Sequence, residues 1–184
     1  QRQMCIRDSS HTCTYGGISA FSTGMGSTDL AAGMALGETW FKVPPTIRVN
    51  ITGTPDQYLR AKDLMLILIH RIGVDGARYK ALEFGGSVID NLPVEGRLTM
   101  ANMAIEAGAK NGIFPVDDVT RSYLKGRSQR EPVFYTADPD AEYEKTIEID
   151  LDKLEPTVSY PHLPENTHVA SEGKAVSYTH LTLP

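Results

Sequence analysis

Two short stretches of the sequence hold side chains that could act on a small molecule. The first stretch, residues 10–17, reads SHTCTYGG and combines hydroxyl groups, an imidazole and a thiol directly before a glycine pair. The second stretch, residues 98–110, reads LTMANMAIEAGAK and is apolar or small except at a few positions. Polar side chains in a loop ahead of flexible glycines are typical of a segment that contacts a substrate.

The polar positions of the second stretch share one side of the helix that we expect there. They are Thr99, Asn102, Glu106 and Lys110, and the spacings between them are three, four and four residues. Such spacings bring side chains onto one helical face. This face could simply meet water, because glutamate is rarely buried. It could instead face a binding site, since the alanines and Gly108 let other backbone approach the remaining sides, and both interpretations stay open.

Other residues that could carry chemistry match no site pattern by themselves. Ser10 and His11 are neighbours in the sequence, so they do not form a nucleophile and its base, which meet in space. Gly24 and Gly26 lack the third glycine and the preceding strand of a dinucleotide-binding fingerprint. Cys13 is more typical of a small buried hydrophobic residue than of a reactive thiol.

Composition excludes several classes of protein. The 184 residues are 41% hydrophobic and 22% charged, which is enough to bury a core without disulfides. The 18 basic and 23 acidic side chains are scattered and give a net charge of -5, so we expect no nucleic-acid partner. The longest apolar run, residues 64–69, is far shorter than the roughly 20 residues of a membrane span, so we expect no membrane partner. With only two cysteines, we expect reduced thiols in a cytoplasmic protein.

The elements expected around these stretches alternate between helices and strands. Helical patterns or start and stop signals occur at residues 27–36, 60–72, 98–109 and 117–124. Apolar alternation or short buried runs predict strands at residues 46–52, 79–84, 112–116 and 145–151. This alternation favours an α/β layered fold with a largely parallel sheet. We expect a solvated loop at residues 136–144 and an extended connection at residues 156–173.

Three stretches taken together resemble the aconitase superfamily. They are SHTCTYGGISAFSTGMGSTDLAAGMALGETWFKVP, NMAIEAGAKNGIFPVD and IEIDLDKLEPTVSYPHLPENT. The SHT element and the NMxxExGA helix occur in the order and at the separation of that superfamily. Within it, the chain is most similar to the branch of 3-isopropylmalate dehydratase large subunits and their homoaconitase relatives, over residues 10–173.

The resemblance implies a hydro-lyase. Such an enzyme removes water from a hydroxy-di- or tricarboxylic acid and adds it back at the neighbouring carbon, here exchanging 2-isopropylmalate and 3-isopropylmalate in leucine biosynthesis. The resemblance also implies a [4Fe-4S] cluster in the intact enzyme, where one iron acts as a Lewis acid, and a separate small subunit as partner. By the same resemblance, Ser10 and His11 contact the substrate and the water at the iron, Glu106 holds that water, and Asn102 bonds near a cluster sulfur.

The resemblance further implies that this chain alone holds no cluster. The cluster ligands of the family are one cysteine in an SCTN-type segment and two in a CxxC segment, and the sequence contains neither segment. Cys13 does not stand at a ligand position, and Ser9 stands where the family has an aspartate before the serine. We therefore expect no metal ligands, no bound cluster and no catalysis in the chain as given, which is then an internal piece of a longer enzyme.

The expected domain organisation follows from the same resemblance. Both ends look non-native, because MCIRDS and VSYTHLTLP are similar to translated adapter sequence. The layered α/β/α domains of the family would meet at Pro44-Pro45. The expected parts are a non-native end at 1–9, the C-terminal part of a first domain at 10–43, a second domain at 44–155, a linker toward a third domain at 156–175 and a non-native end at 176–184.

Two other functions stay open at this stage. The chain could belong to the large subunit of a homoaconitase or a dimethylmalate dehydratase, because substrate choice in this family lies largely on the small subunit. It could also be a non-catalytic α/β binding domain that kept the fold and lost the chemistry.

Overall fold

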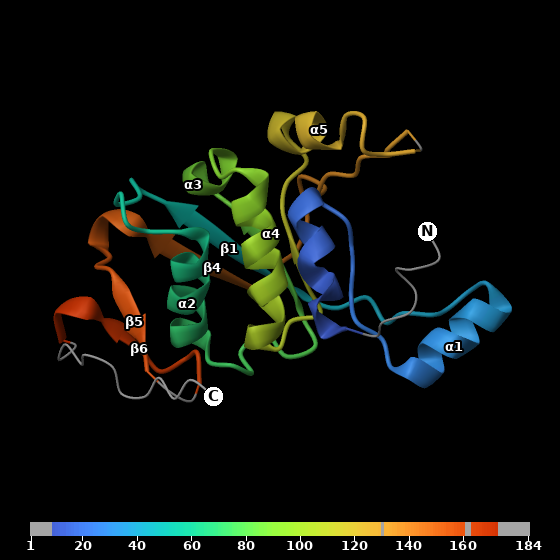
Figure 1. The fold of residues 1–184 in the computed structure, drawn as a ribbon, viewed down its shortest axis with the longest axis horizontal. Helices are drawn as coiled ribbons and strands as arrows, with labels where there is room; N and C mark the ends of the chain where they lie inside the picture. Colours follow the sequence, from blue (N-terminus) through green and yellow to red (C-terminus); the bar gives the residue numbers. More distant parts are fainter. Residues whose placement is uncertain (1–8, 130, 161–162, 173–184) are drawn as a thin grey trace, which may run out of the picture.

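A four-stranded parallel sheet forms the centre of the computed structural model, which describes residues 9–129, 131–160 and 163–172. The strand order is β3-β2-β1-β4 (Figure 1). The strands are β1 (Thr46–Thr52), β2 (Ala81–Gly85), β3 (Asn111–Ile113) and β4 (Lys145–Asp150). All three pairings are parallel, which confirms the expected α/β fold.

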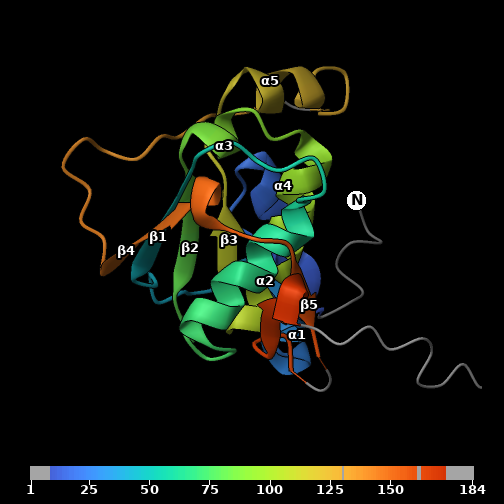
Figure 2. The same cartoon turned by 90° about the vertical axis from the view of Figure 1, so that its left-hand side faces the viewer.

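Helices connect the strands of the sheet. The helical elements are η2 (Ser10–Ile18), α1 (Ser27–Leu36), α2 (Ala61–Ile72), α3 (Ser87–Asp90), α4 (Val94–Met103), η3 (Ala104–Ala107), α5 (Asp118–Leu124), η4 (Leu151–Lys153) and η5 (Ala170–Glu172). In Figure 2, α2 and α4 lie on the same face of the sheet. Among the described residues, no helix is long and apolar enough to cross a bilayer.

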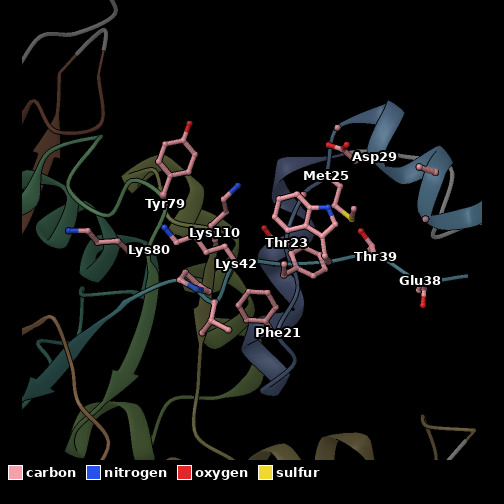
Figure 3. A pocket seen from close by; sticks show the side chains of 18 of the residues that line it. Phe21, Thr23, Met25, Asp29, Glu38, Thr39, Lys42, Tyr79, Lys80 and Lys110 are labelled. Atoms are coloured by element: carbon pink, nitrogen blue, oxygen red, sulfur yellow. The ribbon is translucent and has the colours of Figure 1, made fainter. Parts of the chain in front are cut away.

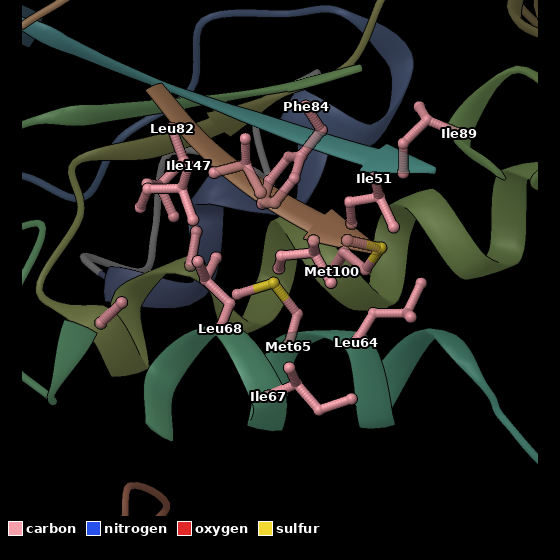
Figure 4. Close-up of a cluster of buried hydrophobic side chains, with 14 of the residues drawn as sticks. Ile51, Leu64, Met65, Ile67, Leu68, Leu82, Phe84, Ile89, Met100 and Ile147 are labelled. Atoms are coloured by element: carbon pink, nitrogen blue, oxygen red, sulfur yellow. The ribbon is translucent and has the colours of Figure 1, made fainter. Parts of the chain in front are cut away.

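The core lies between the sheet and the helices α2 and α4. Alternate residues of β1 are buried because the side chains of a strand point to opposite faces. Figure 4 shows strand residues meeting helix residues in this layer, among them Ile51, Leu82, Phe84 and Ile147 from the strands and Leu64, Met65, Leu68 and Met100 from the helices. The core therefore fixes α4 against the sheet.

The opposite face of the sheet carries polar side chains. Arg48 and Glu83 form an ion pair between β1 and β2, and the Tyr143 hydroxyl donates a hydrogen bond of 3.0 Å to Glu83. Asn50 donates to Glu148 across β1 and β4 at 2.8 Å. Cross-strand pairs of this kind stabilise a sheet only modestly where water reaches them.

The helix expected at 98–109 has different bounds and a different end. It begins at Val94, because Pro93 at the N-cap has a backbone φ of -65° that suits a helix start. The α-helix ends at Met103, and the short 3-10 helix η3 follows and stops at Gly108, whose φ of 79° favours glycine. Lys110 lies beyond this end, so the prediction that it shares a face with Asn102 is wrong.

Other expectations were met in part. The bounds of α1 and β1 are those predicted, and residues 136–144 contain no helix or strand. The strand expected from Tyr79 begins only at Ala81, since Tyr79 has a positive φ of 59° that a strand does not allow. The expected extended connection at 156–173 contains an antiparallel pair, β5 (Thr157–Ser159) with β6 (Thr167–Val169). The prediction for the chain ends falls largely outside the described residues, and the boundary at Pro44-Pro45 stays a prediction.

Candidate active site

Two glycines allow η2 to lie directly against α4 and β3. A Cβ atom on Gly17 would lie 2.7 Å from the backbone nitrogen of Leu98, and one on Gly16 would overlap the carbonyl oxygen of Gly112. The expected flexible loop is therefore wrong: residues 10–18 form a 3-10 helix, and both glycines are buried. In Figure 1, this helix is the blue helical segment beside α4. The close approach brings the two stretches singled out in the sequence into contact.

His11 and Glu106 meet across this contact. The distance from His11 Nε2 to Glu106 Oε1 is 3.4 Å, and the two side chains are 47% and 45% exposed. An imidazole beside a carboxylate can take up and release a proton, and both groups can hydrogen-bond a water or a hydroxyl group. The arrangement is suited to moving a proton at a surface open to a ligand.

Asn102 lies one turn before Glu106 and is half-buried. Its Nδ2 atom donates a hydrogen bond of 2.8 Å to Thr14 Oγ1. The Thr14 hydroxyl in turn donates to the backbone oxygen of His11 at 2.7 Å. Asn102 and Glu106 thus both contact η2, so the polar helix face is turned toward another segment at these two positions. Thr14 was not among the predicted site residues, because only the fold reveals its partner.

Cys13 is buried beside Asn102. Its thiol lies 3.5 Å from the Asn102 carbonyl oxygen and donates to it. Burial raises the pKa of the Cys13 thiol, and the nearby backbone hydrogen bonds oppose this only in part. The thiol therefore stays protonated near neutral pH, as expected for a structural rather than a reactive cysteine. Cys5 lies outside the described residues.

Ser10 lies at the start of η2 and is exposed. It lines a neighbouring hollow of about 580 Å³ together with Gly24, Arg78 and Lys110. Gly24 passes over Ser10 so closely that a Cβ atom there would lie 2.9 Å from the Ser10 Cα atom. The structure thus gives Gly24 a packing role, and it places Ser10 beside the contact of His11 with Glu106 rather than within it.

A larger pocket of about 720 Å³ lies next to this hollow (Figure 3). It is bordered by α1, by the segment leading into β1 and by residues 78–80, and Phe21, Trp40 and Phe41 contribute exposed aromatic rings. His11, Asn102 and Glu106 do not line it. Its size alone therefore does not make it the candidate site, because the predicted site residues lie along η2, α4 and η3.

An ion pair between the buried Arg97 and the partly exposed Asp117 anchors the start of α4. The Arg97 side chain is fully buried, and its guanidinium donates to both carboxylate oxygens of Asp117, at 2.9 and 2.6 Å. The remaining N–H groups reach the backbone oxygens of Ile89 and Leu92 and the Thr120 hydroxyl. Burial alone would raise the pKa of Asp117, but the hydrogen bonds from Arg97 and Thr120 outweigh it and hold this pKa below its usual range. No local sequence pattern predicts this pair, since its partners lie in separate elements.

The donor set along η2, α4 and η3 suits a substrate and water better than a metal. It contains an imidazole, an amide and a carboxylate, whereas the one described cysteine is buried and protonated. In the described part of the chain, no cluster of three or more His, Cys, Asp or Glu residues could hold a metal ion. Thiolate ligands for an iron-sulfur cluster would have to come from elsewhere.

A family model for the aconitase family (aconitate hydratase) matches residues 1–180. The chain belongs to the aconitase family. Among curated aconitase-family relatives, the chain is similar to proteins named "3-isopropylmalate dehydratase large subunit" from three bacteria. The relative from Lachnoclostridium phytofermentans is 56% identical over 95% of this chain and 41% of its own length. Those from Helicobacter hepaticus and Desulfovibrio desulfuricans are 58% and 61% identical, over 89% and 92% of this chain and 39% and 40% of theirs.

The chain therefore spans about 40% of the length of these aconitase-family relatives. The match covers both stretches that meet along η2 and α4. The predicted roles of Ser10, His11, Asn102 and Glu106 in a reaction remain predictions.

Proposed function

We propose that this chain is part of the large subunit of a cytoplasmic 3-isopropylmalate dehydratase that works in leucine biosynthesis. The observation that carries the proposal is the contact of His11 with Glu106, beside Asn102, in a chain of the aconitase family. The names of the relatives favour isopropylmalate over other hydroxy acids. The proposed partner is a separate small subunit, and the substrate is a small hydroxy-dicarboxylate.

The reaction requires a proton at the hydroxyl group that leaves. Dehydration breaks one C–O and one C–H bond, and hydroxide is a poor leaving group unless it is protonated. His11 Nε2 and Glu106 Oε1 lie 3.4 Å apart, and we assign to this pair the delivery of a proton to the departing oxygen. In the reverse direction, the pair takes a proton from the water that adds. The base that removes the carbon-bound proton is assigned to the small subunit.

The other two predicted residues bind and orient. Asn102 keeps a second amide N–H and its Oδ1 after bonding Thr14, and this N–H would donate to a sulfur of the cluster when one is bound. Ser10, exposed at the start of η2, donates to a substrate carboxylate. When bound, a [4Fe-4S] cluster supplies a Lewis acid that weakens the C–O bond. Its thiolate ligands would be cysteines outside the residues that the structure describes.

A substrate panel tests the proposal. The complete large subunit containing this segment would be produced with its small subunit, loaded with iron and sulfide under anaerobic conditions, and assayed by the ultraviolet absorbance of the unsaturated acid. We expect 3-isopropylmalate to give the highest kcat/KM. Preference for homoaconitate or dimethylmalate would assign the chain to another branch. Loaded protein without any hydro-lyase activity would favour the binding-domain alternative.

A further inference from the structure

The hydroxyl group of Thr14 bonds both segments that form the candidate site. It donates its single proton to the His11 carbonyl oxygen at 2.7 Å. It therefore has only lone pairs left for Asn102, 2.8 Å away. The group that Asn102 turns toward Thr14 must then be the amide nitrogen, not the amide oxygen. The hydrogen-bond network thus selects one of the two orientations of this amide.

This selection decides what Asn102 offers to a ligand. With one N–H committed to Thr14, the side chain keeps its Oδ1 and one further N–H. Without the threonine hydroxyl, the amide would lose the partner that distinguishes its two ends, and the final torsion of asparagine is broad. Both orientations would then be populated, and the donor and acceptor atoms would exchange places.

The backbone at this point does not depend on the Thr14 hydroxyl. The Cys13 thiol contacts the Asn102 carbonyl oxygen, and Gly17 holds η2 against Leu98 by close backbone contact. Removal of the hydroxyl therefore changes the side-chain orientation of Asn102 while leaving the two segments packed together.

We propose that Thr14 is a positioning residue, whose hydroxyl fixes the amide orientation of Asn102 and couples it to the backbone of His11. This inference deepens the proposed function and rests on it. Thr14 acts through Asn102 and does not itself touch the substrate.

Three variants of the complete large subunit, each assembled with the small subunit, test this role. Thr14→Val removes the hydroxyl at nearly constant volume, and Thr14→Ser keeps it. Thr99→Val is the matched control, because the Thr99 hydroxyl makes the same kind of helical bond, to the Glu95 oxygen at 2.8 Å, without a partner on η2. We expect Thr14→Val to lower kcat/KM about tenfold, the equivalent of one lost hydrogen bond. Thr14→Ser should restore most of it, and Thr99→Val should match the parent.

A crystal structure of each variant gives a readout that does not depend on activity. We expect a single Asn102 orientation in the parent and in Thr14→Ser, and a rotated or doubled one in Thr14→Val. An unchanged Asn102 orientation in Thr14→Val overturns the inference, as does a parental kcat/KM or an equal loss in Thr14→Ser. If the parent complex has no dehydratase activity, the proposed function fails, while the amide orientation still decides whether Thr14 positions Asn102.

Discussion

The role proposed for Glu106 depends on its carboxylate as well as on its position beside His11. Glutamine has the length of glutamate but neither accepts a proton nor carries a negative charge. We predict that Glu106→Gln lowers the kcat of the complete enzyme by about 10²- to 10⁴-fold, the range of general acid–base catalysis. The melting temperature should change little, because the Glu106 side chain is 45% exposed. Steady-state kinetics and thermal melting check both parts.

Glu95 provides the control for this substitution. It is an exposed acidic residue of α4, the helix directly before η3, which carries Glu106. Glu95→Gln therefore changes the net charge equally, away from His11. Equal activity of Glu106→Gln and Glu95→Gln would remove Glu106 from the reaction.

The sequence was informative about site residues only where local spacing carried the signal. The four-residue spacing of Asn102 and Glu106 placed both on one turn of a helix, and the structure brings both to η2. The family resemblance supplied Ser10 and His11 as site residues, and the contact of His11 with Glu106 came from the fold. Thr14 gave no local signal, because a threonine hydroxyl finds a backbone oxygen in most settings and its second partner depends on long-range packing.

At the scale of the elements, the ion pair of Arg97 with Asp117 holds α4 to the start of α5. We predict that Asp117→Asn lowers the free energy of unfolding by about 3–5 kcal/mol, because it leaves a buried guanidinium without a counter-ion. The exposed neighbour Asp118 supplies the control variant Asp118→Asn, which should cost far less. Denaturant unfolding followed by circular dichroism measures the difference, and equal stabilities of the two variants would contradict this account.

The same pair predicts a dependence on pH. The pKa of Asp117 in the folded chain is lower than its ordinary value, so the ionised carboxylate stabilises the fold fully above the unfolded pKa of about 3.9. This stabilisation disappears as the pH falls through the lower folded pKa. The stability gap between the parent and Asp117→Asn should therefore be widest near neutral pH and narrow below about pH 4. A gap that widens in acid would contradict the assigned direction.

The hydrophobic pattern of the sequence predicted an element well where a single period runs through the whole segment. The strict alternation of residues 46–52 set the bounds of β1. The start of α4 was missed because Gly96 interrupts the pattern just after Pro93. The glycine pair of η2 was interpreted as flexible, yet Gly17 is required for contact with Leu98, far away in sequence. A glycine that allows close backbone contact and a glycine that makes a loop flexible look the same in the sequence, because neither leaves a periodic signal. Only the fold distinguishes them.

At the scale of the whole molecule, one side of the chain exposes apolar surface. Helix α1 buries none of its residues, and it extends away from the sheet (Figure 1). The exposed large side chains near it are Met34, Leu36, Trp40, Phe41 and Val43. Contiguous apolar surface usually marks an interface. Since the chain spans about 40% of the length of its relatives, we expect other parts of the large subunit to cover this side.

The fluorescence of Trp40 tests whether this surface is covered in the complete large subunit. Trp40 is the single tryptophan of the chain and is 86% exposed, so the chain alone should show the red-shifted emission and iodide quenching of an indole in water. In the complete large subunit, the difference spectrum between the parent and Trp40→Phe should be blue-shifted and protected from iodide. A shielded Trp40 in the chain alone, or an equally quenched one in the complete subunit, would contradict the expected cover.

The proposed reaction takes place where η2 meets α4 and η3. A double-mutant cycle of His11→Asn and Glu106→Gln on the dehydration of 3-isopropylmalate by the complete enzyme tests it most directly. If the two side chains share one proton, the double variant should be about as slow as the slower single variant. Rate losses that multiply, or single variants with parental turnover, would contradict a shared catalytic role for His11 and Glu106.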